Sequence, residues 1–203
     1  MAKVCHLLEL VVIRQLQGRA DEIEPALREA VDSYASTYPV CRCAHVHVLA
    51  LMGREAEARD ALAEVAADGF GVLDFDETWL AATAFLTEAA YTLNEPDHAR
   101  ALYERLSPYS DRLAVSTPEV SLGSIPRYLA LAAAASNRVE LAIEHFEEAY
   151  AFETRVGAPA WAAVTLAEHA ALTGDAELAG RAIEECTALG LEVMAQRAAA
   201  VIG

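Results

Sequence analysis

The sequence predicts an all-α protein: a right-handed solenoid of about five helical hairpins, closed by one terminal helix. A turn residue recurs along the chain at intervals of 35, 41, 43 and 37 residues, at Gly18, Gly53, Asn94, Asn137 and Gly174. Hydrophobic residues make up 55% of the chain but aromatic residues only 7%, which favours close helix-on-helix packing. A hairpin repeated at this spacing cannot bury its apolar face alone. We therefore expect residues 1–203 to form one continuous unit.

The residues around each turn keep the same register in all five copies. Five places after the turn stand Ile23, Ala58, Ala99, Ala142 and Ala179, and nine places after it stand Leu27, Leu62, Tyr103, Phe146 and Ile183. Eight places before it stand Leu10, His45, Leu86, Leu129 and Leu166. Because a helix turns about 100° per residue, such positions form one packing stripe on each helix.

This register predicts the helices in order. They are 3–17 with 21–35, 40–52 with 55–67, 78–93 with 95–107, 125–136 with 138–155, 159–173 with 175–189, and a terminal helix at 191–201. The corresponding repeats are 3–35, 40–67, 78–107, 124–155 and 159–189. Asp21 and Glu24 have the spacing of a capping box, and Pro25 suits the first turn of the same helix. We expect no strand.

Two connections are longer than such a repeat needs, at 68–77 (DGFGVLDFDE) and 108–123 (PYSDRLAVSTPEVSLG). Long connections in compact proteins either cover an edge of the fold or carry binding contacts. Both possibilities stay open at this point.

The small residue five places after the turn and the large one nine places after it resemble the tetratricopeptide repeat over nearly the whole chain. The Trp, Gly and Pro signposts of that repeat are mostly absent. Stretches such as TWLAATAFLTEAAYTLNEPDHARALYERL and ALAAAASNRVELAIEHFEEAYAFETR, within residues 69–173, also resemble the repeat region of LuxR-type transcriptional regulators and ATPase-coupled adenylate cyclases. In those large bacterial ATP-binding signalling proteins the repeats form a sensor or interaction arm. The chain has no GxxxxGK[ST] motif, paired cyclase Asp or basic helix-turn-helix, so the resemblance implies only the function of the arm.

Charge and residue usage exclude several classes of function. The chain has 15 basic and 31 acidic residues, and its net charge of -16 would repel nucleic acid and anionic membranes. Lys3 is the one lysine, so a P-loop or Schiff-base lysine is excluded. Four irregularly spaced cysteines indicate a reduced, cytoplasmic protein. The apolar run at 4–13 is too short to span a bilayer. We expect no enzyme activity and no cofactor.

The segment CRCAHVH at 41–47 is the densest group of metal-type side chains. On a helix, Cys41 lies near His45 and Cys43 near His47, but the two pairs point about 200° apart and cannot share one tetrahedral ion. His45 stands where the other repeats have Leu. We therefore expect it to be a partly buried packing residue, with no metal bound.

Two further groups have a simpler explanation than chemistry. Asp74, Asp76 and Glu77 precede a predicted helix, and we expect them to cap it rather than to hold a cation. Ser121 and Ser124 lie in SLGSI, which lacks the GxSxG elbow of a hydrolase.

The predicted binding site is the concave face, which the first helix of each hairpin lines in a tetratricopeptide stack. The register places ten candidate residues there: Leu8, Val12, Cys43, His47, Glu88, Tyr91, Arg127, Leu131, Trp161 and Glu168. Tyr91, Arg127 and Trp161 are the expected anchors, because aromatic and Arg side chains dominate binding energy where partners desolvate them. Alternatively, this groove is solvated or filled by the long connections.

We therefore expect a protein-interaction or regulatory arm of a cytoplasmic bacterial signalling or transcription-regulator protein, with a protein or peptide bound on its concave face. The alternative is a small-molecule sensor domain. The first helix carries LLELVVI and the last ends in AAAVI, without the polar caps that solenoid ends need. We expect either a piece of a longer protein or a homo-oligomer formed through these ends.

Overall fold

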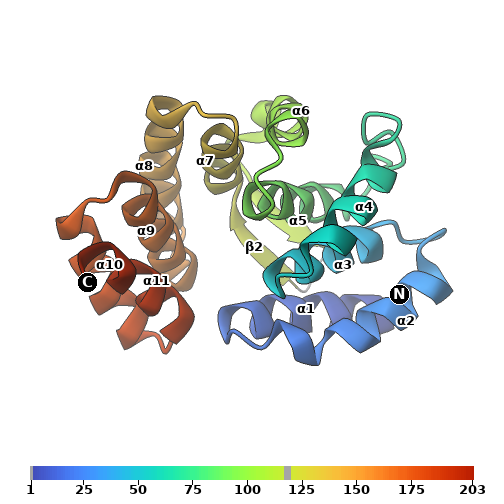
Figure 1. Ribbon diagram of the computed structural model, residues 1–203, viewed down its shortest axis with the longest axis horizontal. Coiled ribbons are helices and arrows are strands. Elements are labelled where there is room, and N and C mark those ends of the chain that lie inside the picture. The colour runs from blue at the N-terminus through green and yellow to red at the C-terminus, as the bar shows by residue number, and fades with distance from the viewer. Residues whose placement is uncertain (1, 117–119) are drawn as a thin grey trace.

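The computed structural model describes residues 2–116 and 120–203, which are mostly helical (Figure 1). The α-helices are α1 (Ala2–Leu16), α2 (Glu24–Tyr34), α3 (Val40–Leu51), α4 (Glu55–Ala66), α5 (Trp79–Thr92), α6 (Pro96–Leu106), α7 (Ile125–Ala135), α8 (Val139–Arg155), α9 (Pro159–Thr173), α10 (Ala176–Ala188) and α11 (Glu192–Ile202). The 3-10 helices are η1 (Ala20–Glu22) and η2 (Ser107–Tyr109), and the strands are β1 (Leu113–Ser116) and β2 (Val120–Ser124). The mainly helical prediction is confirmed. Apart from α2, each helix ends within one residue of the predicted bounds.

The five predicted turn residues all have the left-handed backbone conformation. Their φ values are 69° at Gly18, 71° at Gly53, 55° at Asn94, 59° at Asn137 and 69° at Gly174. Gly and Asn adopt this conformation more easily than other residues, which is why they recur there. In four of these turns the next residue donates its amide to the carbonyl five residues earlier, as from Glu95 to Ala90 at 2.9 Å. This bond closes the end of the preceding helix.

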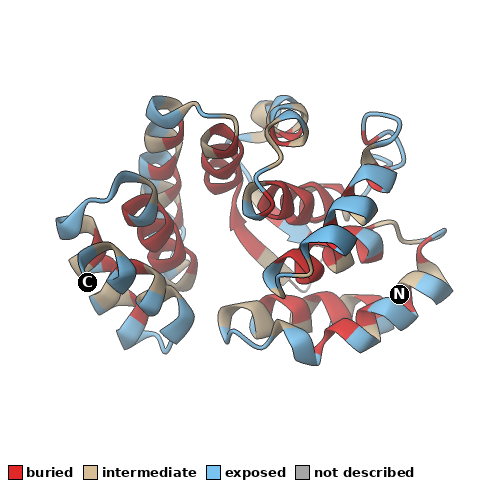
Figure 2. Cartoon of the chain, in the orientation of Figure 1, coloured by how far each residue is buried: buried red, intermediate tan, exposed pale blue. Residues whose placement is uncertain are grey.

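One connected hydrophobic core links the helices, from Val4 in α1 to Ala198 in α11. Helix α3 packs against α5 and α5 against α7, while α8 packs against both α7 and α9. The small residues five places after the turns are fully buried at Ala58, Ala99, Ala142 and Ala179, as predicted. Buried residues lie on the sides of the helices that face the interior (Figure 2).

The connection at 108–123 corrects the prediction that the chain has no strand. β1 and β2 pair antiparallel, with Leu113 opposite Ser124 and an irregular register before Val115. Each strand is only 4 or 5 residues long, too short for alternation in the sequence to predict. Tertiary packing supports the pair instead, because β2 contacts α1, α5, α7, α8 and α9 and buries Leu122 (Figure 1).

The predicted capping box at the start of α2 is also wrong. Asp21 lies in η1, and α2 has no side-chain cap, although Pro25 does lie in its first turn. Glu24 is buried and accepts hydrogen bonds from Arg28 and Arg54 at 2.6 and 3.0 Å. Burial alone would raise the pKa of Glu24, but Arg28, His45 and Arg54 hold it at about 2. Glu24 therefore links α2 to the following hairpin rather than capping its own helix.

The last helix returns to the first. A Cβ atom built on Gly18, just after α1, would collide with Cγ2 of Val193 in α11. In Figure 1, α11 lies beside one end of α1. The row of helices thus curves until its first and last members meet, and this curvature decides what becomes of the inner face.

Candidate functional site

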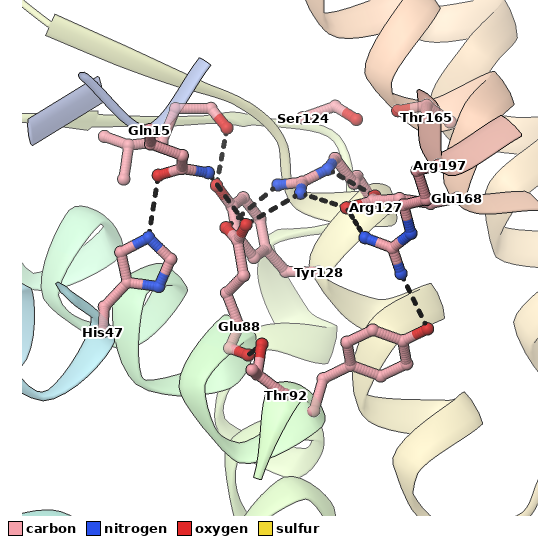
Figure 3. A network of polar contacts seen from close by, with 12 residues as sticks. Gln15, His47, Glu88, Thr92, Ser124, Arg127, Tyr128, Thr165, Glu168 and Arg197 are labelled. Carbon is pink, nitrogen blue, oxygen red and sulfur yellow. Dashed lines mark hydrogen bonds and ion pairs between the residues drawn. The ribbon is translucent and has the colours of Figure 1, made fainter. Parts of the chain in front are cut away.

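Each odd-numbered helix contributes one polar side chain to a network at the centre of the protein (Figure 3). The six residues, here called the central network, are Gln15 of α1, His47 of α3, Glu88 of α5, Arg127 of α7, Glu168 of α9 and Arg197 of α11. They come from every second helix because these helices all face the inside of the curve. The network therefore occupies the predicted concave face.

Arg127 lies at the middle of the central network. Its Nε and Nη2 atoms donate to the two carboxylate oxygens of Glu168 at 2.8 and 2.6 Å. Its Nη2 and Nη1 atoms also donate to Glu88 at 3.2 and 3.4 Å. The guanidinium carbon lies 5.0 Å from the ring centre of Tyr128 and 5.4 Å from that of Trp161. Two carboxylates and two aromatic rings thus replace the water that Arg127 loses on burial.

Two arms extend from this centre. On one side Gln15 donates to Glu88 at 2.8 Å, and its carbonyl oxygen lies 2.7 Å from Nε2 of His47. On the other side Arg197 donates to the hydroxyl of Tyr91 at 3.1 Å and lies 3.7 Å from Glu168. The network therefore connects α1 and α3 at one end of the chain with α11 at the other.

The charges of the central network are balanced. Burial would raise the pKa of Glu88, but Arg127 and Arg197 hold it below the usual value. Burial would lower the pKa of Arg127, but Glu168 and Glu88 hold it well above the usual value. Burial lowers the pKa of His47, which keeps this imidazole neutral at pH 7. Two carboxylates then face two guanidinium groups.

A buried carboxylate outside the central network, Glu153, joins α8 to β2 and α9. Oε1 of Glu153 accepts hydrogen bonds from the backbone amide and the hydroxyl of Ser124 at 2.9 and 2.8 Å, and Oε2 accepts one from Thr165 at 2.7 Å. Burial raises the pKa of Glu153, against the effect of these hydrogen bonds. The contact fixes the hairpin over the inner face.

The predicted binding residues are largely enclosed within the protein. Buried are Leu8, Val12, Cys43, His47, Glu88, Arg127, Leu131, Trp161 and Glu168, and Tyr91 is partly buried. The register did bring His47, Glu88, Arg127 and Glu168 to one face, but the expected exposure of the anchor residue Arg127 is not observed, because it is 0% exposed. The β-hairpin packs against α1, α5, α7, α8 and α9, so one of the long connections covers this face, which was the alternative that the sequence left open.

Sequence reasoning missed the partners that do not lie on the first helix of a hairpin. Arg197 belongs to the terminal helix, which the register does not cover, and Glu153 lies on the second helix of its hairpin. One signal was usable: Glu88 and Glu168 each stand six places before a turn residue, Asn94 and Gly174, and so mark polar residues at equivalent positions of two repeats.

The segment CRCAHVH lies in α3, and its side chains have separate partners. His45 Nε2 lies 3.3 Å from Glu24, whereas Sγ of Cys43 donates to the carbonyl of Pro39 at 3.4 Å. Burial raises the pKa of Cys41 to about 11 and raises that of Cys43 further. Among the residues that the structure describes, no group of three or more His, Cys, Asp or Glu side chains is arranged to hold a metal ion.

The acidic connection before α5 does not show the expected cap, because Asp76 bonds the residue that precedes the helix and the N-cap residue Thr78 makes no side-chain capping bond. The carboxylate of Asp76 accepts hydrogen bonds from the amide and the hydroxyl of Thr78 at 2.8 and 2.9 Å. Asp76 therefore orders the turn that leads into α5.

The two long connections meet at a group of aromatic and Arg side chains, of which Phe75 and Arg112 are exposed, Arg105 and Tyr109 partly buried and Trp79 buried. This aromatic patch consists of Phe75, Trp79, Arg105, Tyr109 and Arg112. Phe75 is 70% exposed, and its ring centre lies 5.2 Å from that of Trp79 and 5.7 Å from that of Tyr109. Arg105 lies over Trp79 and Arg112 over Tyr109, at 5.7 and 5.4 Å. Phe75 is the most exposed large hydrophobic side chain among the described residues, whereas Phe is usually buried in proteins.

No protein-family model, curated protein or solved structure matches this chain. The resemblance to the tetratricopeptide repeat therefore rests on the register of the chain alone. Within the described part of the chain, no helix has both the length and the apolar character needed to cross a bilayer.

Proposed function

We propose that the chain is a helical-repeat interaction module, a tetratricopeptide-like right-handed solenoid that binds a protein or peptide segment. The five left-handed turns, each followed five places later by a buried residue, support the repeat. The resemblance to the repeat arms of bacterial regulators supports a role in a cytoplasmic signalling protein. The inner face is enclosed, so the partner in this proposal binds an outer surface.

The observation that carries the proposal is the exposure of Phe75 within the aromatic patch. A partner that covered this side chain would remove apolar surface from water, worth about 2 kcal/mol. Tyr109 lies beside Phe75 and Arg112 lies over Tyr109, and Tyr and Arg are enriched among residues that dominate binding energy. The surrounding rings hold Phe75 in place, so little side-chain freedom is lost on binding.

The experiment is to select peptides against the purified chain from a displayed library and to measure their affinity by fluorescence anisotropy. Phe75→Ala should weaken binding by about 30-fold, the equivalent of about 2 kcal/mol. Val139→Ala is the matched control, since Val139 is also an exposed apolar residue but lies on α8. Peptides that bind the Phe75→Ala and Tyr109→Ala variants as tightly as the unaltered chain would refute this assignment.

The second candidate function is a small-molecule sensor. One observation favours it: a cavity of about 530 Å³ lies between α8, α9 and α10. This volume is in the usual range for pockets that hold small ligands.

A further inference from the structure

The cavity between α8, α9 and α10 has an apolar floor and a charged rim. Ile143 of α8, Leu166 of α9 and Leu178 of α10 supply the apolar side chains. Glu147 and Glu177 stand at the rim on opposite helices, α8 and α10. The cavity is separate from the central network and from the aromatic patch, so it can be tested independently of the function proposed above.

Several polar groups of the cavity already have partners within the chain. Arg181 lies over the ring of Tyr150 at 5.5 Å and donates to its hydroxyl at 3.4 Å. Tyr150 in turn donates to Glu185 at 2.9 Å. Asp175 accepts the amides of Glu177 and Leu178 at 2.8 and 3.0 Å, which occupies the amides at the start of α10. Neither the amides at the start of α10 nor the guanidinium of Arg181 is therefore available to bind an anion.

His169 is different, because it is enclosed but has no hydrogen-bond partner for its ring among the described residues. It lines the cavity, it is only 8% exposed, and its ring stacks on Phe146 at 5.5 Å with an interplanar angle of 14°. Burial lowers the pKa of His169, more than Glu147 and Asp175 raise it, so the ring is neutral at pH 7 and one nitrogen is a hydrogen-bond acceptor. An enclosed acceptor beside a cavity is suited to a ligand that donates a hydrogen bond.

The carboxylates at the rim also have no counter-ion in the chain. Within the part of the chain that the structure describes, Glu147 and Glu177 form no ion pair, and Arg181, the Arg among the lining residues, contacts Tyr150 instead. The whole chain carries a net charge of -16, which adds to the attraction for cations. Within the same part of the chain no three side chains are arranged to hold a metal ion, which favours an organic cation over a metal.

We propose that this cavity binds an organic cation, an amino or guanidinium group on a short apolar chain, with the charge between Glu147 and Glu177 and a hydrogen bond to His169. The apolar stem lies against Leu166 and Leu178, as the stems of Lys and Arg side chains do on protein surfaces. The cation is either a free amine or a Lys or Arg side chain of a peptide, since both present the same group.

The test measures binding to the whole chain by isothermal titration calorimetry, in about 0.1 M salt to screen remote charges. The free probe is agmatine, with N-butylurea as a neutral counterpart of similar shape. The peptide probe is a five-residue peptide with a central Arg, with the citrulline peptide as its neutral counterpart. Binding by agmatine shows that a free cation is sufficient, and binding by the peptide alone identifies a protein source.

The decisive comparison is between two variants with the same change in net charge. The double variant Glu147→Gln/Glu177→Gln should bind the agmatine or Arg-peptide probe at least about tenfold more weakly than the unaltered chain does. The reason is that a charge-assisted hydrogen bond is worth at least about 1.4 kcal/mol. The control Glu144→Gln/Glu184→Gln alters exposed carboxylates of the same helices outside the cavity and should leave binding unchanged. In NMR, a His169 ring signal, identified by its loss in His169→Gln, should shift on titration with the probe.

Three results would overturn the proposal: equal weakening by both double variants, equal binding of the neutral counterparts, or no binding of either cation up to about 10 mM. Phe75→Ala should leave cation binding unchanged. The failure of either proposal can therefore be recognised separately from that of the other.

Discussion

Replacing Arg127 by Met tests whether the central network holds the helices together. Met keeps an unbranched stem of similar length but removes the guanidinium group. Glu88 and Glu168 then remain in the interior without the cation that contacts both of them. Gln15 still donates to Glu88, and Arg197 still lies 3.7 Å from Glu168, so the loss is partial on each side.

The expected cost follows from the burial of these groups. Arg127 is 0% exposed and donates four hydrogen bonds of 2.6 to 3.4 Å to the two carboxylates. Removing one partner of a buried ion pair costs about 3–5 kcal/mol, because the remaining charge is left without compensation. A domain of this size has a total stability of about 5–15 kcal/mol. We therefore expect a fall in melting temperature of about 10 °C.

The assay is urea unfolding followed by circular dichroism at pH 7 and pH 5, with the triple variant Glu88→Gln/Arg127→Met/Glu168→Gln as the control. The triple variant should regain most of the lost stability, because no unpaired carboxylate remains. The lowered pKa of Glu88 means that this group stabilises the unaltered protein at neutral pH. Without Arg127, burial would raise the pKa instead, so the deficit of Arg127→Met should shrink as the pH falls from 7 to 5.

Two outcomes would refute the reasoning about Arg127. One is a loss of less than about 1 kcal/mol, which would mean that the carboxylates find water or other partners. The other is a triple variant as unstable as Arg127→Met, which would mean that the stem and not the charge matters.

Three further predictions concern a buried acid, the closure of the fold and a buried thiol. Glu153→Gln should stabilise the protein increasingly as the pH rises above about 4.3, the ordinary pKa of Glu in the unfolded chain. Burial raises the pKa of Glu153 in the folded protein, so above that pH the unfolded chain loses the proton more readily and is favoured. Urea unfolding at several pH values measures this difference. Gly18→Ala should cost about 1–3 kcal/mol more than Gly53→Ala in thermal unfolding, because both strain a left-handed turn but only the first collides with Val193. Burial raises the pKa of Cys41 to about 11, so labelling by a thiol reagent at pH 8 should require unfolding.

Each of these has its own control. A Glu153→Gln variant whose advantage is the same at pH 5 and pH 8 would contradict the burial of an ionisable group. Val193→Ala should bring Gly18→Ala back to the level of Gly53→Ala, and failure to do so would mean that the first and last helices do not touch in solution. Labelling of Cys41 as fast as that of a small free thiol would show that α3 opens readily.

Short-range chemistry made the helices and turns predictable. Asn94 and Asn137 stand where the chain must adopt a positive φ, and Ala99 and Ala142 stand where two helices approach closely. The residues that give each of these signals lie close together in the sequence, so a helix or turn can be predicted from them without knowledge of the rest of the fold. The same register showed which residues share the inner face. It did not predict β1 and β2, whose short strands depend on contacts with helices distant in sequence.

The sequence by itself determined the helical hairpins, their left-handed turns and the set of polar residues that face inwards. Only the tertiary structure decided whether that face is open or closed. A small rotation between neighbouring hairpins accumulates along the row, and its sum depends on how every interface packs. Here α11 returns to α1, with Val193 against Gly18, and Arg197 reaches Tyr91 of α5, so polar groups that could otherwise meet a partner bond each other inside the protein.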